Sequence, residues 1–221
     1  MNVLVVAPHM DDEVLGCGGT IARHVAAGDA VSVCIVANRA YEHRYDPARI
    51  DRENAACRAA RDVLGYDGLT FLDLPDERLD AATVDVLVPL EKVFAERRPD
   101  RVYLPHAGDP HQDHPVVFRA GWIAARAIAP AAPRTVLGYE VPSATEQAPP
   151  GVGTSFEPNV FVSVAEVLDA KLAAWACYEV EARAFPHPRS PEAIRALAAW
   201  RGAQAHLPAA EAFMLLRDRW D

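Results

Sequence analysis

Runs of apolar residues alternate along this chain with longer segments in which apolar positions recur at helical spacing. The runs at 2–7 (NVLVVA) and 31–37 (VSVCIVA) are rich in β-branched residues. This pattern is typical of strands that are buried on both faces of a parallel sheet. Shorter runs predict four further strands, at 69–72, 101–104, 136–141 and 160–164.

Segments with helical apolar spacing lie between these strands and often end at glycine or proline. They predict helices at 13–27, 47–64, 81–97, 165–182 and 191–204, and one more that begins near Pro115. Strands and helices that alternate at this spacing predict an α/β fold with a doubly wound, Rossmann-like, mostly parallel sheet flanked by helices. Because we find no repeat or linker, we expect a single domain over residues 1–221, with an irregular C-terminal third after Pro130.

The composition is that of an ordinary globular protein, with 51% hydrophobic and 24% charged residues. The formal net charge of −9 argues against a nucleic-acid partner, because binding to phosphates requires basic residues. No apolar run approaches the roughly 18 residues of a membrane-spanning helix, and the run at 2–7 is too short for a signal peptide. We therefore expect a cytoplasmic protein with a small-molecule partner and no membrane contact. The sequence does not decide between a monomer and a homo-oligomer.

The first group of chemically active residues follows the strand at 2–7 and reads Pro8-His9-Met10-Asp11-Asp12-Glu13. Ligands of open parallel sheets bind at the carboxyl ends of the strands. Adjacent carboxylates at such a place repel each other unless a cation joins them. His9 and Asp12 can both reach one Zn²⁺, and Asp11 can then act as a general base on a water that the metal activates. The alternative is that the carboxylates only cap the following helix.

The second group follows the strand at 101–104 and spans His106 to His114. It contains three histidines and two aspartates, and it also lies at a carboxyl end. One of its histidines would complete a three-ligand zinc site with His9 and Asp12, and three ligands leave a position open for catalysis. The spare histidine, paired with Asp113, would be an acid with a tuned pKa. The alternative is a solvated loop with scattered polar residues.

These two groups resemble the HPDDE and HxDH signatures of the PIG-L/LmbE-like zinc-dependent de-N-acetylases. Here they read His9-Met10-Asp11-Asp12-Glu13 and His111-Gln112-Asp113-His114. The resemblance covers nearly the whole chain, through Leu74-Pro75-Asp76 and the C-terminal stretches at 186–190, 201–202 and 210–213.

The resemblance implies one Zn²⁺ per chain, held by His9, Asp12 and His114. It also implies that Asp11 is the general base, and that His111, held by Asp113, is the general acid or oxyanion stabiliser. Members of this family remove acetyl groups from sugars of the N-acetylglucosamine type, and some relatives cleave larger amides. We therefore expect an N-deacetylase that acts on an N-acetylated amino sugar or its glycoside.

Two further residues are candidates for substrate contacts. Arg52 could bind a hydroxyl or phosphate of the substrate, or it could be a solvated helix arginine. Asp109 could contact the substrate, orient a ligand histidine or shape a turn. Two other functional classes stay open: a zinc-dependent amidase of non-sugar amides, and a non-enzymatic binding protein on a decayed scaffold. The presence of every polar residue of both signatures argues against decay.

Overall fold

The structure, a computed structural model, describes residues 1–38, 46–151 and 153–220. Its centre is a seven-stranded sheet in the order β3-β2-β1-β4-β5-β7-β6. The strands are β1 (Asn2–Ala7), β2 (Ala30–Asn38), β3 (Gly68–Pro75), β4 (Arg101–Pro105), β5 (Thr135–Tyr139), β6 (Val160–Ser163) and β7 (Ala210–Asp218). The first five are mutually parallel, whereas β7 runs antiparallel to both β5 and β6. The predicted α/β fold with a mostly parallel sheet is thus confirmed.

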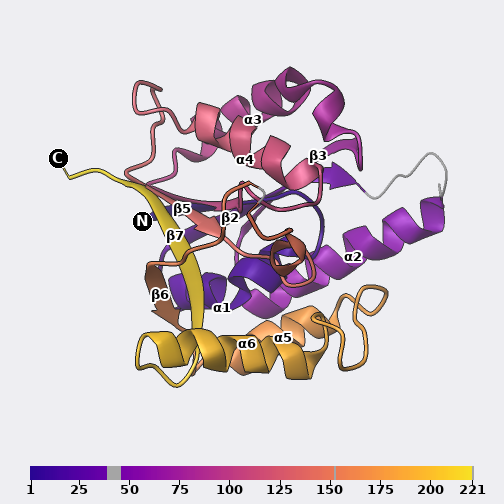
Figure 1. Ribbon diagram of the computed structural model, residues 1–221. Coiled ribbons are helices and arrows are strands. Elements are labelled where there is room, and N and C mark those ends of the chain that lie inside the picture. The colour runs from indigo at the N-terminus through magenta and orange to yellow at the C-terminus, as the bar shows by residue number, and fades with distance from the viewer. Residues whose placement is uncertain (39–45, 152, 221) are drawn as a thin grey trace.

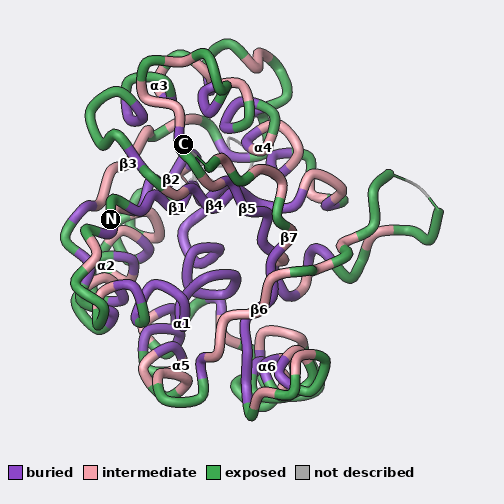
Figure 2. The backbone as a smooth tube through the Cα atoms, turned by 90° about the vertical axis from the view of Figure 1, so that its left-hand side faces the viewer, coloured by how far each residue is buried: buried purple, intermediate pink, exposed green. Residues whose placement is uncertain are grey.

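Helices cover both faces of the sheet (Figure 1). They are α1 (Asp12–Ala26), α2 (Pro47–Leu64), α3 (Thr83–Arg97), α4 (Asp113–Ala124), α5 (Leu168–Ala176) and α6 (Pro191–Gln204), with short 3₁₀ helices η2 (Leu79–Ala81) and η3 (Thr145–Gln147). One hydrophobic cluster joins the sheet to α1, α2 and α5, and a second joins it to α3 and α4. Figure 2 shows α1 and the central strands as the most buried part of the molecule. No helix of the described residues is both long and apolar enough to cross a membrane.

The position of the functional residues follows from the strand order. Successive strands are added on one side of β1 up to β3, and β4 then pairs with the other side of β1. The carboxyl ends of β1 and β4 therefore lie side by side at the point where the winding of the sheet reverses. In doubly wound sheets this point opens a crevice between the diverging connections. Both groups of chemically active residues found in the sequence begin at these two strand ends.

The C-terminal third differs most from the prediction. The helix predicted at 165–182 ends at Ala176, because the chain then turns to bring Tyr178 into contact with Glu13. Strand β7 is not predicted by the apolar pattern. Its sequence, AEAFMLLRD, suits a helix as well as a strand, and pairing with β5 and β6 on its two sides decides the outcome.

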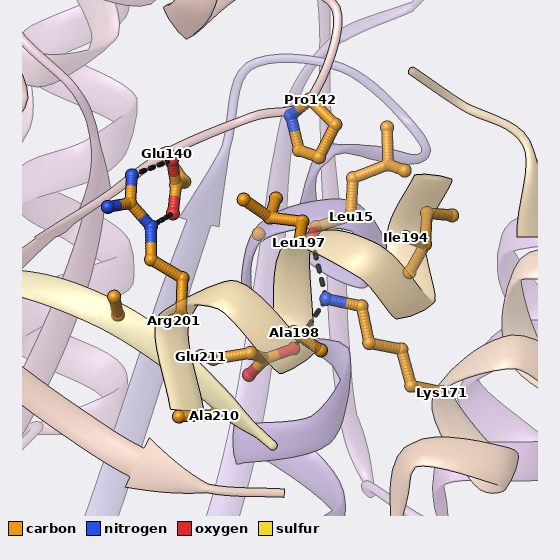
Figure 3. Close-up of a pocket in the computed structure, with 12 residues that line it drawn as sticks. Leu15, Glu140, Pro142, Lys171, Ile194, Leu197, Ala198, Arg201, Ala210 and Glu211 are labelled. Atoms are coloured by element: carbon orange, nitrogen blue, oxygen red, sulfur yellow. Dashed lines mark hydrogen bonds and ion pairs between the residues drawn. The ribbon is translucent and has the colours of Figure 1, made fainter. Parts of the chain in front are cut away.

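A buried ion pair joins β7 and α5 to the middle of α1 (Figure 3). Lys171 Nζ donates to Glu211 Oε1 at 2.6 Å and to the Leu15 carbonyl at 2.8 Å. The Glu211 carboxylate accepts the backbone N–H groups of Gly19 at 2.9 Å and Thr20 at 2.7 Å. In a regular helix the Gly19 N–H would donate to Leu15. Two side chains from the C-terminal third thus complete the hydrogen bonding of α1, and beside them lies a cavity of only about 20 Å³.

Candidate metal and catalytic site

The turn between β1 and α1 is fully buried and has an unusual backbone conformation at Asp11. The φ angle of Asp11 is 107°, a value that non-glycine residues rarely adopt and that costs on the order of 1–3 kcal/mol. The turn is held because the Asp11 carbonyl accepts the N–H groups of Val14 and Leu15, while Glu13 Oε2 accepts the Asp11 N–H at 3.0 Å. This turn brings His9, Asp11 and Asp12 to the crevice.

The distances from Asp12 to two histidines are those expected between ligands of a zinc ion. Asp12 Oδ2 lies 3.2 Å from His9 Nδ1 and 3.4 Å from His114 Nε2. Zinc holds nitrogen and oxygen ligands at about 2.0–2.2 Å, so the ligand atoms of a tetrahedral site are roughly 3.3–3.6 Å apart. All three residues are buried. The Asp12 carboxylate thus lies at zinc-ligand spacing from each of the two histidines that the resemblance assigns to the metal.

Two further carboxylates hold the other side of the His9 ring. His9 Nε2 lies 3.0 Å from Asp113 Oδ2 and 2.9 Å from Asp76 Oδ1. The Asp113 carboxylate also accepts the N–H groups of Glu77 at 2.8 Å and Leu79 at 3.2 Å. Although burial opposes it, hydrogen bonding to Asp113, Asp12 and Asp76 raises the pKa of His9 well above its ordinary value. These contacts orient Nδ1 of His9 toward Asp12.

Asp109 holds His114 in the same way. Its Oδ2 lies 2.6 Å from His114 Nδ1, so that Nε2 points toward Asp12. Burial lowers the pKa of His114, but the charge of Asp12 and the contact with Asp109 outweigh it and raise the pKa to about 9. The Asp109 side chain is 0% exposed. A carboxylate enclosed against a histidine ring favours the orienting role among those expected for Asp109.

Replacement of Asp109 by Asn is expected to weaken metal binding by roughly 10–100-fold, the usual cost of losing a carboxylate that orients a ligand histidine. The affinity can be measured by competition with a chromophoric chelator. Asp169→Asn is the matched control, because Asp169 is 88% exposed and pairs only with Arg195 among the described residues. An unchanged affinity in Asp109→Asn would contradict the orienting role.

His111 lies at the open side of this cluster. Its ring centroid is 4.6 Å from that of His9 and 5.1 Å from that of His114, and one nitrogen from each ring falls within 4.8 Å of the others. Burial and the neighbouring charges of His9 and His114 lower the pKa of His111 to about 4. The sequence predicts that His111 pairs with the Asp113 carboxylate. In the structure that carboxylate binds His9, and His111 Nδ1 instead accepts the Asp113 backbone N–H at 3.3 Å.

These groups face a cavity of about 340 Å³, a volume suited to a small ligand. The residues that line it are His9, Asp12, Asp76, Pro110, His111, Gln112, His114, Ser143, Ala144 and Arg189. Arg52 lies outside it, on α2, where its side chain is 57% exposed and pairs with Asp46 at 3.4 Å. The structure therefore places Arg52 outside the cavity that His9, Asp12 and His114 line.

Asp76 and Arg189 are residues of the cavity to which the sequence analysis gave no role. Both lie in stretches that carry the family resemblance, Leu74-Pro75-Asp76 and Pro186-His187-Pro188-Arg189-Ser190. The one sequence signal that could have pointed to Asp76 and Arg189 is that these stretches belong to the same family resemblance as the two signatures. Their contacts could not be derived from it, because Asp76 and Arg189 lie far along the chain from the groups they meet, His9 and Asp11.

Residues 4–125 match the model of the family PIG-L, described as GlcNAc-PI de-N-acetylase. The chain is 32% identical over 179 residues to the uncharacterized deacetylase YaiS of Escherichia coli K12, which covers 78% of this chain and 88% of YaiS. It is 26% identical over 190 residues to the diacetylchitobiose deacetylase of Thermococcus kodakarensis, with 80% and 69% of the two chains covered.

A solved structure with the same fold carries a different activity in its name. GalB, the 4-carboxy-2-hydroxymuconate hydratase of Pseudomonas putida KT2440, matches with a TM-score of 0.79 and 24% identity, over 100% of this chain and 98% of that chain. At this identity the likeness shows the fold alone. Since a fold does not determine a reaction, the reaction has to be argued from the residues of the site.

Proposed function

Because this chain belongs to the PIG-L family of de-N-acetylases, we propose that it is a zinc-dependent hydrolase that removes the acetyl group from an N-acetylated amino sugar or its glycoside. The products are acetate and the free amine. The observation that carries the proposal is that His9, Asp12, His111 and His114 line one cavity. Asp12 lies at zinc-ligand spacing from both His9 and His114, and the buried Asp11 is its neighbour in the chain.

His9, Asp12 and His114 would hold one Zn²⁺ per chain. Three protein ligands leave a position open, as in other catalytic zinc sites. When bound, Zn²⁺ supplies Lewis acidity, which polarises the acyl oxygen and lowers the pKa of a coordinated water. Although burial raises it, the charge of His114 and hydrogen bonds to His114 and His9 hold the pKa of Asp12 well below its ordinary value. Asp12 is therefore anionic, as a metal ligand must be.

We assign to Asp11 the role of taking a proton from the attacking water. It adjoins the ligand Asp12, its side chain is 0% exposed and Arg189 holds its Oδ2. A carboxylate in a fixed orientation beside the reacting water acts as a general base. The leaving amine needs a proton in turn, and Asp11 can return the one that it took. Asp11 therefore serves both halves of the reaction.

His111 donates a hydrogen bond to the oxygen that becomes negative. Burial, which lowers the pKa of His111, favours the neutral ring, and a neutral imidazole donates from one nitrogen only. Because Nδ1 accepts the Asp113 N–H, we assign the ring proton to Nε2. A neutral donor aimed at a developing oxyanion stabilises the transition state without carrying charge itself. Two roles are expected for His111, general acid and oxyanion stabiliser. A neutral ring that donates from Nε2 favours the oxyanion stabiliser.

Replacement of His111 by Ala is expected to lower kcat by about 10²–10⁴-fold, the usual scale for losing such a donor. The metal content should stay unchanged, and KM should move much less, because the interaction strengthens only as charge develops. Steady-state kinetics and elemental analysis measure both quantities. Arg126→Ala, at an exposed ion pair with Glu91 outside the cavity, is the control. Loss of the metal from His111→Ala would instead make His111 a ligand.

The substrate class is tested by acetate release from a panel of N-acetylglucosamine, N,N'-diacetylchitobiose and simple N-acetylglucosamine glycosides. Acetylated lysine peptides and acetanilide are the controls. We expect turnover of the sugars, in line with the named activity of the Thermococcus relative. Turnover of the controls alone would support the second candidate, a zinc-dependent amidase of non-sugar amides. Failure to hydrolyse any amide, with metal bound, would refute both.

A further inference from the structure

The Asp11 carboxylate is anchored by a residue from the other end of the chain. Arg189, in the loop before α6, donates from Nη1 to Asp11 Oδ2 at 3.0 Å. Asp11 is completely buried, and an ionised carboxylate is costly in such a place unless a cation and hydrogen bonds compensate it. Arg189 is therefore part of what allows Asp11 to be charged inside the protein.

The Arg189 guanidinium has little freedom to move. Its Nη1 also donates to Glu181 Oε2 at 2.8 Å, and its Nε donates to Ser143 Oγ at 2.6 Å. Its backbone is fixed as well, because the buried Trp175 donates from Nε1 to the Arg189 carbonyl at 2.9 Å. A planar guanidinium held on two of its nitrogens gives its partners a defined direction.

The chain of ion pairs continues away from the cavity. Arg49 on α2 donates from Nη2 to Glu181 Oε1 at 2.8 Å and from Nε to Glu53 Oε1 at 2.7 Å. Glu53 and Glu181 are both buried. Arg189 thus faces two carboxylates already, Asp11 and Glu181, and its positive charge is matched within the protein. Such a residue is poorly suited to recruiting an anionic group of a substrate.

We propose that Arg189 is the positioning residue of the general base, with Glu181 and Arg49 as its support. Arg189 fixes the plane of the Asp11 carboxylate, so that the carboxylate meets the attacking water in one orientation. Small misplacements of a catalytic group cost up to about 10²-fold in rate. The inference rests on the proposed function for the role of Asp11 and adds the residue that orients it.

The test is a double-mutant cycle with Arg189→Ala, Asp11→Asn and the double variant, all loaded with zinc. We expect Arg189→Ala to lower kcat by about 10–10²-fold, with KM and metal content nearly unchanged. In the Asp11→Asn background the same substitution should cause no further loss, because it acts through Asp11. Arg189→Lys should have a kcat above that of Arg189→Ala, since lysine keeps the positive charge but lacks the planar set of guanidinium donors. Arg195→Ala, at an exposed pair, is the control that should stay active.

Three results would overturn the proposal. An equal loss of kcat in both backgrounds would mean that Arg189 acts independently of Asp11. A rise in KM at unchanged kcat would make Arg189 a substrate-binding residue. Loss of zinc from Arg189→Ala would mean that the fall in kcat comes from a damaged metal site and not from a misplaced Asp11 carboxylate.

A further measurement separates this inference from the proposed function. If the wild-type protein hydrolyses no substrate of the panel, the proposed function fails. The contact can still be tested by thermal unfolding of a second cycle in which Asp11→Ala, which removes the carboxylate, replaces Asp11→Asn. Coupled residues give Tm shifts that do not add, whereas additive shifts would refute the coupling whatever the reaction is.

Discussion

Removal of divalent metal by a chelator is expected to abolish hydrolysis, and addition of one equivalent of Zn²⁺ per chain should restore it. The physical reason is the charge of the cluster. Asp11, Asp12, Asp76, Asp109 and Asp113 are all buried, and Asp12 and Asp76 line the cavity itself. Like charges at such a density resist burial without a cation. Loss of the metal also removes the Lewis acid that the reaction needs.

The measurement is acetate release alongside elemental analysis, before and after chelation. His9→Ala, Asp12→Ala and His114→Ala should each lower the metal content, since each removes one of three ligands. The fold should persist in the metal-free protein, because two large hydrophobic clusters hold the sheet and helices, and circular dichroism can verify it. Full activity in a preparation shown to be free of metal would contradict the proposed mechanism.

Replacement of Asp11 by Asn is expected to keep the metal and lower kcat by about 10²–10⁴-fold, the contribution of a general base. Asn has nearly the same shape and can still accept the Arg189 hydrogen bond, but it cannot take a proton. The fold and the strained turn should therefore survive the change. Kinetics combined with metal analysis distinguish this result from simple unfolding.

Asp12→Asn is the matched comparison for Asp11→Asn, because the two residues are neighbours with the same side chain. It should weaken metal binding, since a neutral amide is a poorer ligand than a carboxylate. If Asp11→Asn lost the metal and Asp12→Asn retained it, the assignments of base and ligand would have to be exchanged.

Elements with strong local signals were predicted with their bounds. Helix α2 begins after Asp46, whose side chain accepts the Ala48 N–H, and ends at Gly65 with φ 78°. Helix α6 begins in the same way after Ser190. Caps of this kind depend on residues close together in the sequence, so they can be recognised before the fold is known. Strand β7 lacks such signals, because its conformation depends on strands distant in the sequence.

The same distinction applies to the site. The sequence predicted that the turns after β1 and β4 would meet, because strand ends of a parallel sheet share an edge. It could not predict which carboxylate holds which ring. The bond between Asp113 and His9 spans 104 residues, and that between Arg189 and Asp11 spans 178. Contacts of this kind depend on the final packing and leave no local pattern.

The Lys171–Glu211 pair limits how this protein can be recombined with its relatives. The family match ends at residue 125, which suggests that the segment after it could be replaced by the corresponding segment of a relative. However, Glu211 accepts hydrogen bonds from two backbone N–H groups of α1, and Lys171 donates to the carbonyl of Leu15 in the same helix. A chimera that replaced the last third with a sequence lacking this pair would leave those buried groups without partners, at about 1–3 kcal/mol for each. Crossover points should therefore keep residues 12–26, 171 and 211 from the same parent.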